Sequence, residues 1–173
     1  MTSLLQKIND LDLRIDNITK QVCFIVSRGG GTVVNVNTIL PYNNIFDNIG
    51  GGFDSNTYTF TCPIAGRYLF SVGFYTNGNN SYSVDLKING GGHDKHERSG
   101  TGAGGNTKQF IVSIAILNVG DTVYVECTLG SIRLFGQNIT RFYGCLLEWT
   151  IINNIYIYIY THGYDAQLTF KIL

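Results

Sequence analysis

The densest group of titratable side chains in the sequence is one stretch flanked by glycines, His93-Asp94-Lys95-His96-Glu97-Arg98. Neutral imidazoles such as those of His93 and His96 are good metal ligands, and a neighbouring carboxylate could supply a third donor. Neither a His-Glu-x-x-His helix nor a Cys-x-x-Cys pair accompanies the stretch. A charged tip on a loop between two strands is therefore favoured over a metal site, and binding modules place recognition in such loops. We predict that this loop binds ligand through His93, Asp94, His96, Glu97 and Arg98.

The sequence lacks two common motifs of catalytic sites. No serine stands in a nucleophile elbow, and no glycine-rich run follows a strand and opens a helix that could hold phosphate. The sequence therefore predicts a non-enzyme without a cofactor, and leaves open whether a structural cation such as calcium binds. Lys plus Arg and Asp plus Glu number 12 each, so no net field attracts nucleic acid or an anionic membrane.

The cysteines have no metal-ligand spacing and lie in apolar or strand contexts, at Cys23, Cys62, Cys127 and Cys145. Two disulfides and buried free thiols are both compatible with these positions.

The composition favours strands and turns. The 173 residues include 21 glycines, 11 tyrosines and 10 phenylalanines, and only 14% are charged. So little charge predicts that part of the surface is covered in an oligomer. Alternation at period two predicts strands at 32–36, 68–72, 82–88 and 122–128, with the first of these opening the head. The run 109–117 is richly apolar and could be a helix on composition alone, but its β-branched residues and its length below ten favour a strand. The glycine-rich segment from Gly90 to Asn106 has no large apolar residue and is expected to be an exposed loop.

Aromatic residues and glycines recur at fixed intervals, at Tyr42, Asn48, Phe53, Phe60 and the run Gly66-Arg67-Tyr68-Leu69-Phe70, with Phe142-Tyr143-Gly144 further on. These intervals resemble the signature of the globular head of complement C1q, within the C1q and tumour necrosis factor superfamily. Two positions depart from it, because Tyr42 stands where Phe is usual and Val72 where an aromatic is expected. The resemblance implies an all-β, ten-stranded jelly-roll sandwich that forms a tight homotrimer. It also implies that the signature residues are core residues, namely Tyr42, Asn48, Phe53, Phe60, Gly66, Tyr68, Phe70 and Gly144.

The first 22 residues carry a separate signal for three-fold assembly. Apolar residues at alternating spacings of four and three predict a coiled-coil seam of Leu4, Ile8, Leu11, Ile15, Ile18 and Val22. Ser3 followed by Gln6 is a capping-box start. An amphipathic helix folded onto its own head is the alternative, but the period of 3.5 favours the coiled coil. Gly29-Gly30-Gly31 is then predicted to be the hinge between stalk and head.

The chain is accordingly divided into a trimeric stalk and hinge (1–28), a C1q-like head (29–149) and an extension (150–173). The extension contains the uncharged, β-prone run Ile155-Tyr156-Ile157-Tyr158-Ile159-Tyr160. It is too short to cross a bilayer as a helix, so we expect it to pair with an edge strand or to pack at the trimer base.

The predicted function is a non-enzymatic homotrimeric recognition module that binds protein or glycan ligands multivalently through its loops. The alternative is a structural trimer, as a spike, fibre or coat component of a viral particle or extracellular matrix. The sequence begins without an apolar signal segment, and the expected location is extracellular or on a particle surface, including a virion. Membrane insertion and nucleic-acid binding are not expected.

Overall fold

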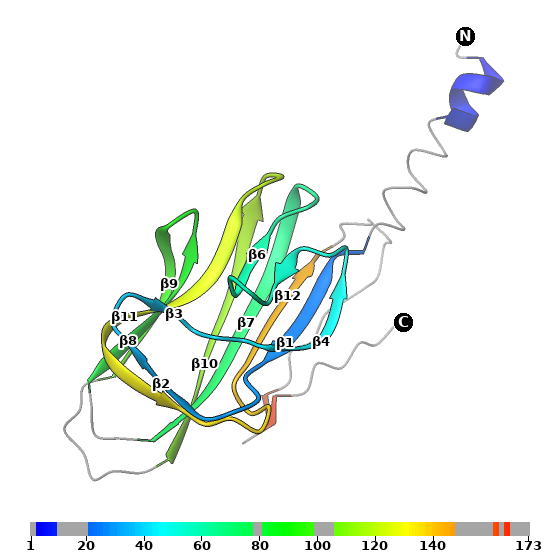
Figure 1. The fold of residues 1–173 in the computed structure, drawn as a ribbon. Coiled ribbons are helices and arrows are strands. Elements are labelled where there is room, and N and C mark those ends of the chain that lie inside the picture. The colour runs from blue at the N-terminus through cyan, green and yellow to red at the C-terminus, as the bar shows by residue number, and fades with distance from the viewer. Residues whose placement is uncertain are drawn as a thin grey trace.

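A computed structural model describes residues 3–9, 21–77, 81–98, 106–147, 161–162 and 165–166. Residues 4–9 are helical, and most of the rest form strands (Figure 1). The strands of the head are β1 (Cys23–Ser27), β2 (Thr32–Asn35), β3 (Thr38–Ile39), β4 (Asn44–Ile49), β5 (Phe53–Asp54), β6 (Thr59–Thr61), β7 (Gly66–Asn77), β8 (Tyr82–Ile88), β9 (Gly91–Arg98), β10 (Asn106–Leu117), β11 (Thr122–Leu134) and β12 (Arg141–Leu146). Two further short strands pair with each other, β13 (Thr161–His162) and β14 (Asp165–Ala166).

The strands of the head form the two layers of a sandwich. The first layer has the antiparallel order β4-β1-β12-β7-β10. The second is built around β11, which pairs with β8, β6 and β3, while β9 lies beyond β8 and β5 beyond β6. β11 joins the layers, because its last residues pair with β2 and Leu134 lies opposite Thr76 of β7. Figure 1 shows the yellow ribbon of β11 curving from one layer toward the other.

Aromatic rings fill the space between the layers. The Phe24 ring stacks on Phe53 and Phe60 at centroid distances of 5.2 and 5.0 Å, and Phe142 meets it edge-on at 4.9 Å. Such contacts stabilise a core beyond the area that they bury. The aromatic residues of the predicted signature are all buried here, namely Tyr42, Phe53, Phe60, Tyr68 and Phe70.

The polar and glycine members of the signature have structural roles. The Asn48 side chain donates to the Phe53 carbonyl at 2.9 Å and accepts from the Phe53 N–H at 3.0 Å, which fixes the chain entering β5. Gly144 faces the aromatic cluster, where a Cβ would collide with the Phe24 ring and lie 2.8 Å from a Phe70 ring carbon. A Cβ at Gly66 would lie 2.6 Å from Leu146. Gly144 therefore allows close packing that a larger residue would block, whereas a larger residue at Gly66 would require the Leu146 side chain to move.

The predicted boundary between stalk and head at residue 28 is wrong. β1 lies inside the first layer, between β4 and β12, so the head includes residues 23–27. The glycines 29–31 connect β1 to β2 rather than a stalk to a head. A five-residue apolar run can continue a helical pattern or form a strand, and only its partner strands decide which.

Val22 belongs to the head rather than to the seam. Its side chain is 2% exposed, and its carbonyl accepts a hydrogen bond from the Leu146 N–H at 2.8 Å. Leu4 and Ile8 lie exposed on the helix of residues 4–9, whose first turn is capped by the Ser3 hydroxyl accepting from the Gln6 N–H at 3.2 Å. The other predicted seam residues, Leu11, Ile15 and Ile18, lie outside the described residues.

Candidate interaction surfaces

The predicted recognition loop is wrong in its first half, because residues 91–98 form strand β9. Asn89 and Gly90 adopt φ of 50° and 82°, which turns the chain back so that β9 pairs antiparallel with β8. Asn-Gly is a strong hairpin signal. The sequence analysis ends a strand at residue 88 and expects an exposed loop after it, whereas the structure has a second strand there. The sequence of β9 is polar and rich in glycine, which is typical of a loop. Edge strands often carry charged side chains, so this composition is also compatible with a strand at the edge of a sheet.

The structure places the predicted ligand-binding residues along β9. His93 is exposed, and its Nε2 lies 3.3 Å from the Ile114 carbonyl of β10, across the open side of the sandwich. Asp94 is half-buried. The backbone of His96, Glu97 and Arg98 belongs to the strand, but their side chains lie outside what the structure describes. Among the described residues no three His, Cys, Asp or Glu side chains gather where they could hold a metal ion.

A row of exposed apolar side chains on β10 is the surface feature that the sequence analysis missed. Phe110, Val112, Ile114 and Ile116 are 57%, 61%, 56% and 75% exposed. The residues between them face the core and are buried, at Ile111, Ser113, Ala115 and Leu117. A strand that is apolar on both faces is expected to be covered on both. The signal in the sequence was a pair of apolar runs, Phe110 to Val112 and Ile114 to Leu117, separated only by Ser113.

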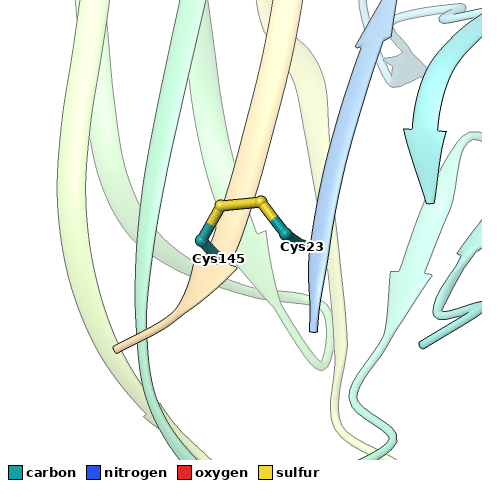
Figure 2. Close-up of a disulfide and its surroundings, with 2 residues drawn as sticks. All are labelled: Cys23 and Cys145. Atoms are coloured by element: carbon teal, nitrogen blue, oxygen red, sulfur yellow. A yellow bond between two sulfur atoms is a disulfide. The ribbon is translucent and has the colours of Figure 1, made fainter. Parts of the chain in front are cut away.

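The apolar row continues across the outward face of the first layer. Ile114 lies opposite Leu69 of β7, Leu69 opposite Cys145 of β12, and Cys145 opposite Cys23 of β1. All four alternate with core residues along their strands and therefore point away from the core. Cys23 and Cys145 are joined by a disulfide, which Figure 2 shows bridging the two adjacent strands. The remaining cysteines, Cys62 and Cys127, are free and buried.

The outward face of the second layer is polar and carries a salt bridge. Lys87 Nζ lies 3.2 Å from Glu126 Oε2. The Asp85 carboxylate accepts from the Ser83 hydroxyl at 3.1 Å and from the Thr128 hydroxyl at 2.8 Å. This face can therefore stay in water, whereas the outward face of the first layer is suited to a protein contact.

A carboxylate ties together two turns at one end of the second layer. Asp121 accepts from the Asn118 N–H at 2.7 Å and from the Asn89 side-chain amide at 2.8 Å. These hydrogen bonds, first the one from the Asn118 backbone and then the one from Asn89, hold the pKa of Asp121 below its usual value. The turn after β8 and the turn before β11 are thus held in one arrangement.

Two antiparallel layers joined by one long strand define the class of jelly-roll sandwich domains. A family model described as the C1q domain matches residues 23–147, well over half of the chain. The protein belongs to the C1q domain family. Both the predicted resemblance to the C1q and tumour necrosis factor superfamily and the all-β jelly-roll fold are confirmed.

Solved structures share this fold at low sequence identity. The globular domain of zebrafish complement 1qA protein is 19% identical, with a TM-score of 0.57 over 74% of this chain and 98% of that one. The tumour necrosis factor Eiger from S. frugiperda is 14% identical, with a TM-score of 0.59 over 75% and 93%. Murine APRIL at pH 5.0 is 14% identical, with a TM-score of 0.60 over 74% and 100%. These likenesses show the fold alone.

Within the described ranges no helix has the length and apolar character needed to cross a membrane.

Proposed function

We propose that this protein is a non-enzymatic homotrimeric recognition module that binds protein or glycan ligands at sites repeated three times around its axis. The exposed apolar row of β10 carries the proposal. Four adjacent side chains, each more than half exposed, form a patch that a soluble monomer rarely leaves in water.

Two parts of the apolar face suit a ring of three subunits. One part is the β10 row at the sheet edge, and the other includes Tyr143 and the disulfide on β12 and β1, further across the same face. When the row of one subunit packs on the β12 and β1 part of the next, the contact joins two different patches, and such contacts form a ring when the rotation between subunits closes. Membership of the C1q domain family supports three as the number of subunits.

The charged strand β9 lies next to this interface. The contact between His93 and the Ile114 carbonyl places β9 beside the β10 row. A trimer built on β10 would then present three copies of β9 near its subunit boundaries, so that weak single contacts add through avidity. The Cys23–Cys145 disulfide suits an oxidising setting such as the extracellular space or a particle surface.

The oligomeric state tests the proposal. In sedimentation equilibrium at micromolar concentration, we expect a mass three times that of the 19.2-kDa chain. Changing Val112 and Ile114 to Asp should place charges in the interface and give monomers. The matched control is Val119→Asp, at a site 67% exposed in the turn after β10, which should stay trimeric. A natural chain that sediments as a monomer would rule the proposal out.

The same proteins test recognition. On protein and glycan arrays, the natural chain and Val119→Asp should retain ligands that the Val112→Asp/Ile114→Asp chain releases, because avidity needs three linked sites. A trimer that binds nothing on the arrays but is found assembled in a particle would favour the structural alternative instead.

A further inference from the structure

Strand β4 is an open, apolar edge of the first layer. In the part of the chain that the structure describes, β4 pairs only with β1. Its large apolar side chains Ile45, Phe46 and Ile49 are 45%, 56% and 42% exposed. It carries one charged residue, Asp47, and its pairing with β1 shifts register between Ile25 and Val26, but it has neither a lysine nor a proline, the residues with which proteins often protect such edges. An edge with these properties pairs readily with another strand.

The head ends beside this edge. Ile49, the last residue of β4, and Cys145, near the end of β12, both lie opposite Cys23 from either side of β1. The chain that follows β12 therefore leaves the sheet at the end where β4 stops. A strand formed from it along β4 would have to run back, antiparallel to β4.

Length and composition after β12 fit that course. Residues 155–160 alternate Ile and Tyr without a charge, and this six-residue run matches the six residues of β4. Residues 148–154 can span up to about 23 Å when extended. Passing from β12 over β1 and β4 to a new edge position needs three strand spacings, or about 14 Å.

We propose that residues 155–160 of the same chain add to the free edge of β4 as an antiparallel strand and extend the first layer. Direction and reach favour this segment over one from another copy. The pairing itself uses the backbone groups at the outer edge of β4 and needs no contact between subunits.

Limited proteolysis of the full chain tests this pairing. Chymotrypsin cleaves after Tyr156, Tyr158 and Tyr160 when the segment is accessible. We expect the Ile45→Lys/Ile49→Lys chain to be cleaved there about tenfold faster than the natural chain, since lysines on the edge disfavour pairing and cleavage follows the population of the open state. Phe46 is left unchanged, because Arg141 lies over its ring at 5.7 Å and its replacement would disturb the head itself. Val119→Lys is the control and should be cleaved at the natural rate.

Hydrogen exchange of the β4 amides gives a second measurement that does not rely on a variant. Amides on both sides of β4 should be protected in the natural chain, whereas an open edge protects only those that point toward β1. Rapid exchange of alternate β4 amides, or equal cleavage of all three proteins, overturns the proposal. Protection of residues 155–160 that is lost on dilution also overturns it, because the strand would then come from a neighbouring copy.

Discussion

At the scale of single residues, Tyr42 is the clearest departure from the family signature, which has Phe at this position. Its side chain is fully buried, and its hydroxyl has no hydrogen-bond partner within the described residues. Burial raises the pKa of Tyr42 well above its usual value, so the group stays neutral. A buried hydroxyl that lacks a partner costs stability.

We therefore expect Tyr42→Phe to raise the free energy of unfolding by about 1 kcal/mol. The matched control is Tyr68→Phe, because the Tyr68 hydroxyl donates to the Ile64 carbonyl at 2.6 Å. That variant should lose about 1 kcal/mol. Urea unfolding of the natural chain and the two variants, all at the same protein concentration, gives both changes in the free energy of unfolding. If Tyr42→Phe were as destabilising as Tyr68→Phe, the Tyr42 hydroxyl would have a partner.

At the scale of elements, the disulfide joins the first and last strands of the head. Cys23 and Cys145 are 122 residues apart in sequence and adjacent across β1 and β12. A link that closes so long a loop restricts the unfolded chain strongly. It also holds β1, which follows the N-terminal segment, next to β12, which precedes the extension.

Changing Cys23 and Cys145 together to Ser should lower the free energy of unfolding by about 2–5 kcal/mol. Dithiothreitol should lower the urea midpoint of the natural chain toward that of the double variant and leave the variant unchanged. Peptide mapping without reductant should recover Cys23 linked to Cys145, with Cys62 and Cys127 free. A natural chain whose midpoint does not respond to reductant would contradict this prediction.

At the scale of the whole molecule, the N-terminal segment and the head are expected to contribute separately to assembly. With Val22 in the head, the predicted seam runs from Leu4 to Ile18, about two heptads, which is too short to form a stable coiled coil alone. We expect such a seam to act by raising the effective concentration of linked heads. Removing residues 1–20 should leave a folded head that still forms trimers, with dissociation at about tenfold higher concentration or more. Sedimentation over a dilution series measures the shift.

The control for this truncation removes residues 1–22. Because Val22 is buried in the head and its carbonyl is bonded to Leu146, this longer deletion should also destabilise the fold, by about 2 kcal/mol. Monomers at every concentration after removal of residues 1–20 would show that the N-terminal segment alone makes the oligomer.

Local patterns in the sequence determined much of the head. The alternation of Tyr82–Ile88 corresponds to β8 with the same bounds, and the run 109–117 lies within β10. The prediction of β8 was accurate because alternation at period two depends on which side chains face the core, a property of each strand by itself. The strand at 109–117 was predicted from its β-branched residues and its short length. The aromatic intervals identified the family for a similar reason, since rings that pack on one another need fixed places along their strands.

Only the tertiary structure decided features that depend on a distant partner. Cys23–Ser27 is a strand because β4 and β12 lie on either side of it, and Cys23 pairs with Cys145 because that register brings the two together. Residues 91–98 are a strand because β8 supplies hydrogen bonds, although their composition resembles a loop. The β10 row became a candidate interface only when the fold showed which of its two apolar faces stays exposed. Pairing and exposure are set by contacts between remote segments, and no local pattern encodes them.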